Sequence, residues 1–376
     1  MRIAVNTRLL LKGRLDGIGW FTFETLRRIV VAHPEHEFLF LFDRKPAPEF
    51  LFADNVRPVV LFPPTRHPIL WYLFFEFSVP RAIRKYKADL LLSPDGWIPL
   101  KSKVPTLNVI HDLNFEHCDD FLNGSHQRYF KKYFPKYARN ATRLATVSEF
   151  SKNDIATTYG VPADIIDVVY DGYHSHYHPY PDSVKTEIRN RYTDGSPYFI
   201  FVGTILKRKN LDTLFAAFDI FKETDTTDAK LLVVGSRKWW KGDIENAYLA
   251  MRHKNDVVFA GRVEADELGK MMSAATALAY VSYFEGFGIP ILEAFRAETP
   301  VVTSNVTSMP EVAGDAALLV NPYKADEIAD ALRTLATDGD LRQSLVEKGL
   351  AQSQKFSWDK TAELLWQSIT KIMPQK

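Results

Sequence analysis

The chain has 376 residues, of which 46% are apolar and 25% are charged, and its formal net charge is +1 at pH 7. This length suits two domains with separate hydrophobic cores, and the near-neutral charge is typical of a soluble globular protein rather than a general nucleic-acid binder. The single cysteine, Cys118, excludes an intrachain disulfide and a multi-cysteine metal site and is typical of a reducing compartment.

The start of the chain, residues 1–10 (MRIAVNTRLL), leads directly into a strand pattern, and the sequence contains no run of 18 or more apolar residues. These features predict neither a signal peptide nor a membrane-spanning helix. We therefore expect a cytoplasmic protein.

Short apolar runs alternate with helical patterns in the first half of the chain, which predicts parallel strands joined by helices. The expected strands cover residues 3–5, 38–42, 90–93, 106–110, 144–147 and 166–169. This alternation predicts a doubly wound α/β domain. A turn-rich stretch at residues 171–181 (DGYHSHYHPYP) follows and places a domain boundary near residues 175–195.

The same alternation resumes after this stretch. The expected strands now cover residues 198–202, 230–235, 257–260, 277–281, 300–303 and 317–320. We assign residues 1–178 to an N-terminal Rossmann-like domain and residues 179–356 to a C-terminal one. Open parallel sheets bind ligands beyond the carboxyl ends of their strands, so two such domains predict a binding cleft between them.

A glycine loop follows the first strand. Gly17 and Gly19 lie in KGRLDGIGW, before an amphipathic helix expected over residues 21–32, where the backbone can approach a phosphate closely. The third glycine of a dinucleotide fingerprint is replaced by Thr22, which disfavours a dehydrogenase.

A basic loop follows the first strand of the second domain. That strand ends at Gly203 and Thr204, and Arg208 with Lys209 precedes a helix expected over residues 211–221. Two cations before a helix N-terminus can balance a diphosphate. The alternative for such a pair by itself is a solvated loop with ordinary surface charge.

A third loop follows the strand expected over residues 277–281. It places residues 285–288 (EGFG) in a tight turn before a helix that is expected over residues 290–297 and begins with a proline. The free amides and the dipole of such a helix end attract anions. The alternative is that Glu293, inside the first turns, only complements the dipole while the glycines only turn the chain.

Together these loops resemble the retaining nucleotide-sugar glycosyltransferases of the GT-B architecture, specifically glycosyltransferase family four. The family's two glutamates, separated by seven residues, stand as EGFGIPILE at residues 285–293. Further stretches match in order: GIG at 17–19, VIHD at 109–112, TVSEFSK at 146–152, YDGYHSHYHP at 170–179, VGTILKRKNLDTL at 202–214, VVGS at 233–236, FAGRV at 259–263 and SMPEVAGDAALLVNP at 308–322. The resemblance covers nearly the whole chain. It implies that residues 357–376 form a terminal helix that crosses back to the first domain.

The resemblance also implies site residues. The expected donor-binding residues are Gly17, Gly19, Gly203, Thr204, Arg208, Lys209, Arg262, Val263, Glu285, Gly286, Phe287, Gly288, Ile289, Ile291, Leu292 and Glu293. The expected catalytic residues are His111, Asp112, Lys209 and Glu285.

The resemblance assigns a role to each charged group. The cations Arg208 and Lys209 would hold the diphosphate, Glu285 the donor sugar and Glu293 the ribose hydroxyls, while His111 would face the donor sugar or the acceptor. Many relatives carry an arginine directly after the glycine that matches Gly203, where this chain has a threonine, so we assign the cationic role to Arg208 with Lys209. In the family the departing phosphate is commonly proposed to take the acceptor's proton.

Two groups could suggest a metal site. His174, His176 and His178 alternate in the linker, and Asp338 with Asp340 forms an Asp-x-Asp pattern between two late helices. No cysteine or acidic cluster completes either group, and we interpret both as structural. We expect a metal-independent enzyme with no cofactor beyond its nucleotide-sugar co-substrate.

The resemblance favours GDP-mannose as donor, followed by a UDP-sugar, and a glycan or lipid-linked saccharide acceptor in surface polysaccharide or glycoconjugate synthesis. A non-hydrolysing nucleotide-sugar epimerase of similar fold and a non-catalytic nucleotide-sugar binding subunit stay open as alternatives.

Two basic, aromatic stretches bear on the acceptor. Residues 121–148 contain six Lys or Arg, no acidic residue and several interleaved aromatics, which suits an anionic membrane surface. Residues 71–87 have a similar composition. The alternative for both stretches is that the aromatics pack under the domain while the lysines are solvated, and for residues 71–87 it explains the pattern at least as well. No nucleic-acid recognition module accompanies either stretch. The expected location is therefore the cytoplasm, at the inner face of the cytoplasmic membrane.

Overall fold

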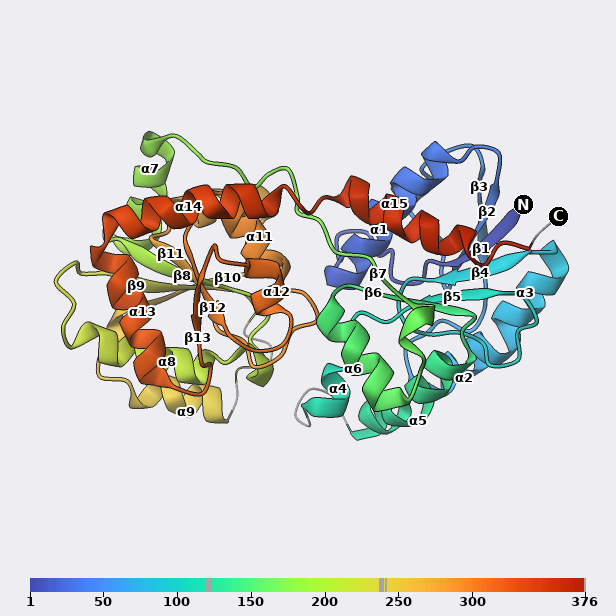
Figure 1. Cartoon of the computed structure of the whole chain (residues 1–376), viewed down its shortest axis with the longest axis horizontal. Coiled ribbons are helices and arrows are strands. Elements are labelled where there is room, and N and C mark those ends of the chain that lie inside the picture. Colours follow the sequence, from blue (N-terminus) through green and yellow to red (C-terminus); the bar gives the residue numbers. More distant parts are fainter. Residues whose placement is uncertain (119–123, 237–239, 241, 375–376) are drawn as a thin grey trace. The chain divides into compact units, whose positions relative to one another are not determined.

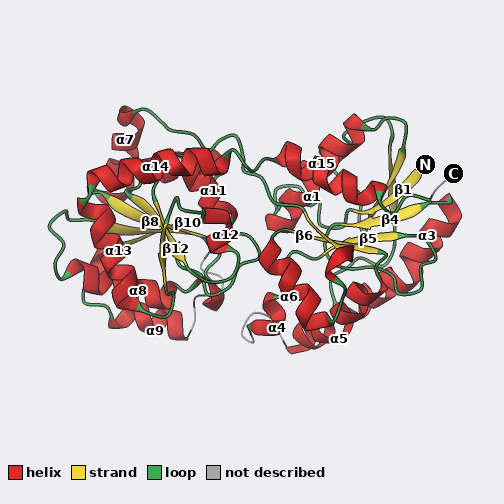
Figure 2. Cartoon of the chain, viewed as in Figure 1, coloured by secondary structure: helices red, strands yellow, loops and turns green. Residues whose placement is uncertain are grey.

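The computed structural model describes residues 1–118, 124–236, 240 and 242–374. The chain divides into two compact units: Met1–Asp171 together with Ser357–Lys376 (unit 1), and Gly172–Phe356 (unit 2). In each unit helices cover both faces of a parallel sheet (Figures 1 and 2). The predicted fold class, two doubly wound α/β domains, is confirmed.

The sheet of unit 1 has the strand order β3-β2-β1-β4-β5-β6-β7, and all neighbours are parallel. Its strands are β1 (Arg2–Asn6), β2 (Glu37–Phe42), β3 (Val56–Val60), β4 (Leu90–Ser93), β5 (Thr106–Val109), β6 (Arg143–Thr146) and β7 (Ile166–Val168). The sequence pattern missed β3, which contains Pro58 and exposes three of its five residues. An edge strand tolerates both features because one side makes no ladder hydrogen bonds.

The helices of unit 1 are α1 (Gly17–Ala32), α2 (Pro68–Leu73), α3 (Val79–Tyr86), α4 (Asn114–His117), α5 (Gly124–Asn140), α6 (Glu149–Tyr159) and α15 (Trp358–Thr370). A π-helical turn, η2 (Phe74–Ser78), joins α2 to α3, and 3-10 turns lie at η1 (Pro48–Phe50) and η3 (Ala163–Ile165). The C-terminal α15 packs against α1, where the rings of His33 and Trp366 stack with centroids 3.6 Å apart.

The sheet of unit 2 has the order β10-β9-β8-β11-β12-β13, again all parallel. Its strands are β8 (Tyr198–Val202), β9 (Lys230–Val234), β10 (Val257–Gly261), β11 (Ala277–Tyr280), β12 (Val301–Ser304) and β13 (Leu318–Val320). Its helices are α7 (Asp182–Thr193), α8 (Leu211–Lys222), α9 (Asp243–Ala250), α10 (Ala265–Ala274), α11 (Ile289–Arg296), α12 (Met309–Ala313), α13 (Ala325–Thr337) and α14 (Gly339–Ser353), with 3-10 turns η4 (Lys207–Lys209) and η6 (Lys254–Asp256).

The strand order reverses direction once in each sheet. In unit 1 the chain runs outward from β1 through β2 and β3 and resumes on the other side with β4; in unit 2 the reversal falls between β8 and β11. Loops that leave two such strands diverge, which opens a crevice beyond the carboxyl ends of the strands. A ligand site is therefore expected at these two switch points.

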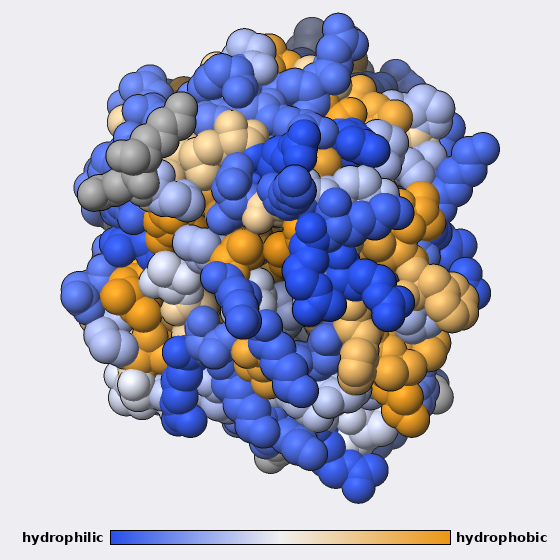
Figure 3. Space-filling view, turned by 90° about the vertical axis from the view of Figure 1, so that its right-hand side faces the viewer, coloured by the Kyte–Doolittle hydropathy of each residue, from blue (hydrophilic) through white to orange (hydrophobic). Residues whose placement is uncertain are grey.

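The surface is mixed in character. Hydrophilic side chains dominate the face shown in Figure 3, and apolar patches lie between them. Among the described residues, none of the helices combines the length and apolar character that crossing a bilayer requires.

Candidate functional site

Two cations and one carboxylate meet at the switch point of unit 2. Lys209 lies in η4, after β8, and its Nζ is 2.7 Å from Oε1 of Glu285, in the loop after β11. The Nη1 atom of Arg208 is 2.7 Å from the other carboxylate oxygen, Oε2. Lys209 also donates a hydrogen bond of 2.7 Å to the hydroxyl of Tyr280. The structure thus brings together three predicted site residues that are up to 77 positions apart in sequence.

The two cations of this cluster determine the ionisation state of Glu285. Burial by itself opposes ionisation of Glu285, but the Arg208 and Lys209 cations outweigh it and lower the pKa of the carboxyl to about 2. Glu285 is therefore an anion at neutral pH. With two cations and one anion the cluster keeps one net positive charge, which favours an anionic ligand.

Hydrogen bonds from Ser308 hold the loop that carries Glu285. The Oγ of Ser308, which precedes α12, donates to the carbonyls of Glu285 and Phe287, both at 2.9 Å. Gly288 then starts α11 with φ +107°, a conformation that L side chains rarely adopt. The helix predicted after the glycine loop is thus present, and the loop before it is held in place. Sequence reasoning did not single out Ser308; its position directly before a helix was the available signal.

Three glycines lie at the carboxyl ends of three adjacent strands: Gly203 directly follows β8, Gly235 directly follows β9, and Gly261 ends β10. Gly235 has φ +155°, and a Cβ built on it would lie 1.8 Å from the carbonyl oxygen of Gly203. The loop after β8 can therefore take its path only because position 235 has no side chain. Gly235 belongs to the VVGS stretch, for which no role was predicted.

The second glutamate of the motif, Glu293, lies inside α11 and is 7% exposed. Burial raises its pKa to about 8, although a hydrogen bond from Tyr177 acts in the opposite direction. Tyr177 belongs to the histidine-rich linker of unit 2, which gives that linker a role that composition alone did not indicate.

A pH dependence follows from this buried carboxyl. The unfolded chain releases the proton near pH 4.5, whereas the folded protein keeps it up to about pH 8. Between these values the folded state binds more protons, so its stability falls as the pH rises, by up to about 1.4 kcal/mol per pH unit. In Glu293→Gln this contribution should vanish, so urea unfolding from pH 5 to 8 should show a flatter dependence than in the parent.

The exposed Glu245→Gln substitution is the control and should leave the parent's pH dependence unchanged. Equal slopes for Glu293→Gln and the parent would contradict a buried, proton-retaining Glu293.

The other expected donor residues lie around this cluster in different environments. Thr204 is exposed after β8, and Arg262 is exposed after the edge strand β10, followed by a half-buried Val263. The side chains of Ile291 and Leu292 are fully buried in the core, so only their backbone could meet a ligand.

In unit 1, His111 follows β5 and is held by the backbone. Its Nε2 lies 2.9 Å from the carbonyl oxygen of Pro94, and its ring packs edge-on against Phe21 at 4.8 Å. Because a carbonyl only accepts, Nε2 carries the proton and Nδ1 is the acceptor of the neutral ring. Burial lowers the pKa of His111, which favours that neutral form. The neighbouring Asp112 accepts a hydrogen bond of 2.9 Å from the backbone N–H of Asn114.

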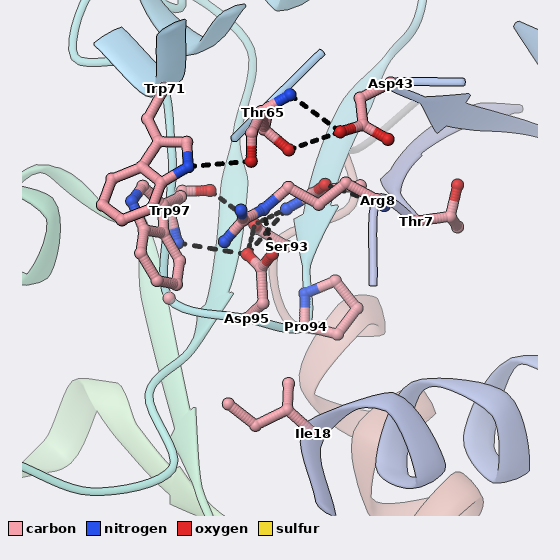
Figure 4. A network of polar contacts seen from close by, with 12 residues as sticks. Thr7, Arg8, Ile18, Asp43, Thr65, Trp71, Ser93, Pro94, Asp95 and Trp97 are labelled. Carbon is pink, nitrogen blue, oxygen red and sulfur yellow. Dashed lines mark hydrogen bonds and ion pairs between the residues drawn. The ribbon is translucent and has the colours of Figure 1, made fainter. Parts of the chain in front are cut away.

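Figure 4 shows a buried polar network at the switch point of unit 1. It lies next to Pro94, whose carbonyl holds His111. Arg8, after β1, donates from Nε to Oδ2 of Asp95 at 2.6 Å, and its guanidinium lies 4.2 Å from the ring centroid of Trp97. Asn6 donates to the other oxygen of Asp95 at 2.7 Å. Asp95 directly follows Pro94, so this network fixes the turn whose carbonyl holds His111. Sequence reasoning missed it, although polar residues directly after β1 and β4 were a signal.

The first glycine loop contains an acidic residue, Asp16, that binds one of the loop's own backbone amides. Asp16 caps α1 and its Oδ1 accepts a hydrogen bond of 3.0 Å from the backbone N–H of Gly19. Helix α1 begins at Gly17, four residues earlier than expected, because of this cap. The amide predicted to approach a phosphate is thus engaged by Asp16.

The described residues contain no group of three or more His, Cys, Asp or Glu side chains arranged to hold a metal ion. The rings of His174 and His176 stack with centroids 5.4 Å apart. Metal independence stays a prediction.

Comparison with known proteins gives matches over both halves of the chain. The family model described as Glycosyltransferase Family 4 matches residues 15–177, and the model described as Glycosyl transferases group 1 matches residues 184–352. The chain is 29% identical over 362 residues to O-antigen chain mannosyltransferase B of Escherichia coli, which covers 93% of this chain and 94% of the relative. It is 28% identical over 270 residues to O-antigen chain mannosyltransferase RfbU of Salmonella typhimurium, with 71% of each chain covered.

Solved structures share the fold over the full length. Sucrose-phosphate synthase from Thermosynechococcus elongatus superposes with a TM-score of 0.79 at 18% identity and 98% coverage of both chains. Anabaena HepE, solved in complex with UDP and glucose, gives 0.75 at 16% identity, with 99% of this chain and 100% of that chain covered. Two Rossmann-like domains with these neighbours define the class by its architecture: the protein has the GT-B fold. It belongs to the family-four-like glycosyltransferases, as EGFGIPILE and the accompanying motifs predict.

Proposed function

We propose that the protein transfers a mannosyl residue from GDP-mannose to a glycan or lipid-linked saccharide during surface polysaccharide synthesis, with retention of anomeric configuration. The observation that carries this proposal is the cluster of Arg208, Lys209 and Glu285 beside the N-terminus of α11. The names of the relatives that match most of the chain, two O-antigen mannosyltransferases, support mannose as the sugar.

In this proposal the cluster stabilises the leaving group. The bond between the anomeric carbon and the phosphate oxygen breaks, and its electron pair stays on the diphosphate while positive charge develops on the sugar ring. Arg208, Lys209 and the amides that begin α11 stabilise the diphosphate, because they are already oriented before the charge develops. A phosphate oxygen then takes the proton of the attacking acceptor hydroxyl on the same face of the sugar.

The two glutamates and His111 have binding roles in this proposal. Glu285 accepts hydrogen bonds from the sugar hydroxyls as its two cations turn to the diphosphate, and Glu293 binds the ribose hydroxyls. The Nδ1 of a neutral His111 accepts a hydrogen bond from the donor sugar or the acceptor. We propose further that no metal ion is needed, because two side-chain cations supply the charge that a metal ion would supply.

A ligand panel tests the function. GDP-mannose and GDP should raise the melting temperature in the presence of EDTA, since a ligand at 100 times its dissociation constant adds about 2.7 kcal/mol to stability. UDP-glucose and UDP are the comparison ligands, and stabilisation by UDP ligands alone would replace GDP-mannose as the donor.

Product analysis by NMR with a saccharide acceptor completes this test and should show an unchanged anomeric configuration. Nucleotide binding without transfer or donor hydrolysis would point to a binding subunit, and an epimerised donor in the absence of acceptor would point to an epimerase.

We also propose that the protein works at the inner face of the cytoplasmic membrane. Residues 121–123 of the predicted contact segment lie outside the described residues. Within α5 the lysines at positions 131, 132 and 136 are exposed, whereas Tyr129, Phe134 and Tyr137 are buried in the core of unit 1. This segment therefore offers charge to a membrane but little apolar surface.

A further inference from the structure

Unit 1 exposes an apolar ridge on the segment that links β3 to α3. More than half of the large apolar side chains that are exposed among the described residues lie between positions 60 and 77. Phe62 is 80% exposed, Ile69 65% and Phe77 55%. A soluble monomer rarely gathers such side chains on one segment unless something covers them.

One hydrogen bond and two ring contacts connect parts of this segment to one another and to α5. The Oγ of Ser78 donates to the carbonyl of Phe62, which joins that loop to the end of η2. The ring of Tyr72, in α2, lies 6.1 Å from the ring of Phe77 and 6.0 Å from that of Tyr133, in α5. Helices α2 and α5 are in contact and lie side by side in Figure 1. We name the set Phe62, Ile69, Tyr72, Leu73 and Phe77 the apolar ridge.

Exposed cations lie on two helices next to this segment, α5 and α3. On α5 the Nζ atoms of Lys132 and Lys136 lie 5.5 and 5.4 Å from the ring centroid of Tyr133, which itself contacts the ridge. Further exposed cations follow η2 and lie on α3 at positions 81, 84 and 85. The only acidic residue of positions 60–87 is Glu76, which is buried and accepts a hydrogen bond from the backbone N–H of Leu100.

We propose that the apolar ridge and these cations form the surface with which the protein docks on an anionic lipid bilayer. The aromatic and aliphatic side chains enter the interfacial layer while the cations contact anionic headgroups. A protein partner for this surface would need acidic groups arranged around an apolar groove. An anionic bilayer presents acidic headgroups and an apolar layer over its whole surface. The inference deepens the proposed membrane location, because it assigns the apolar contact to residues 62–77 and the charge to α3 and α5.

Vesicle cosedimentation tests this surface, with phosphatidylcholine vesicles that contain or lack phosphatidylglycerol. The ridge variant Phe62→Ser/Ile69→Ser/Phe77→Ser should lose more than about tenfold in affinity for the anionic vesicles at low and at physiological salt, because its apolar contact is gone. The charge variant Lys131→Glu/Lys132→Glu/Lys136→Glu should lose binding mainly at low salt, where the attraction is least screened.

The variant Val31→Ser/Leu249→Ser also removes exposed apolar side chains, but away from the ridge, and should bind vesicles like the parent. Each variant should keep the parent's nucleotide-induced thermal shift and its transfer rate to a water-soluble acceptor, which shows that it is folded. A nucleotide response that is absent from the parent would refute the proposed donor but not this surface.

Three results would overturn the inference: a parent that does not bind anionic vesicles, a ridge variant that binds them like the parent, or a parent that self-associates through the ridge without lipid. Sedimentation velocity of parent and ridge variant distinguishes the last case.

Discussion

Glu285→Gln should lower the rate of sugar transfer by about a hundredfold while the affinity for nucleoside diphosphate stays at or above that of the parent. In the folded protein this carboxylate pairs with Arg208 and Lys209 at 2.7 Å, and its low pKa keeps it charged. Its replacement by a neutral amide leaves both cations available to a diphosphate, so binding does not suffer. The transition state, however, loses a charged acceptor that is positioned for the sugar.

Lys209→Met is the matched comparison. This cation would contact the diphosphate in donor, product and transition state alike, so its loss should weaken nucleoside-diphosphate binding and transfer together. Calorimetric titration with the nucleoside diphosphate and initial transfer rates supply both quantities for each variant. If Glu285→Gln abolished nucleoside-diphosphate binding while still folded, or kept full activity, the assignment of this glutamate to the sugar would be wrong.

Gly235→Ala should displace the loop after β8, which belongs to the proposed donor site, and should lower the free energy of unfolding. The new Cβ would lie 1.8 Å from the carbonyl oxygen of Gly203, so the loop after β8 must move. Forced repacking of this kind costs about 1–3 kcal/mol, and positive φ at a non-glycine residue costs on the order of 1 kcal/mol more. Because the displaced loop leads to Lys209, we expect nucleotide affinity to fall by more than about tenfold.

The control variant Gly160→Ala separates the cost of the steric clash from the cost of positive φ. Gly160 ends α6 with φ +62°, and a Cβ there would meet nothing within 4 Å, so only the conformational cost applies. Its nucleotide affinity should equal that of the parent, and its stability should fall less than that of Gly235→Ala. Equal unfolding free energies for the two variants, measured by urea denaturation, would show that the clash at position 235 is relieved without cost.

The fold followed from local patterns that could be read directly. Strand and helix periodicities predicted two doubly wound domains, and the motifs around EGFGIPILE predicted the family; both are confirmed. The edge strand β3 was not predicted, because its pattern is that of a half-exposed strand with a proline. The start of α1 was predicted too late in the sequence, because the prediction left out the cap by Asp16.

The sequence by itself determined the features that depend on near neighbours: glycines where the backbone turns, a proline at the start of α11 and cations before α8. Only the tertiary structure decided which distant groups meet. Examples are Arg208 and Lys209 with Glu285, and Ser308 with the loop that carries Glu285. It also decided which aromatic stretch faces solvent: residues 129, 134 and 137 are buried, whereas residues 72 and 77 are exposed. Both stretches carry aromatics on more than one helical face, so periodicity could not choose between them; packing against elements distant in sequence determines which face is covered.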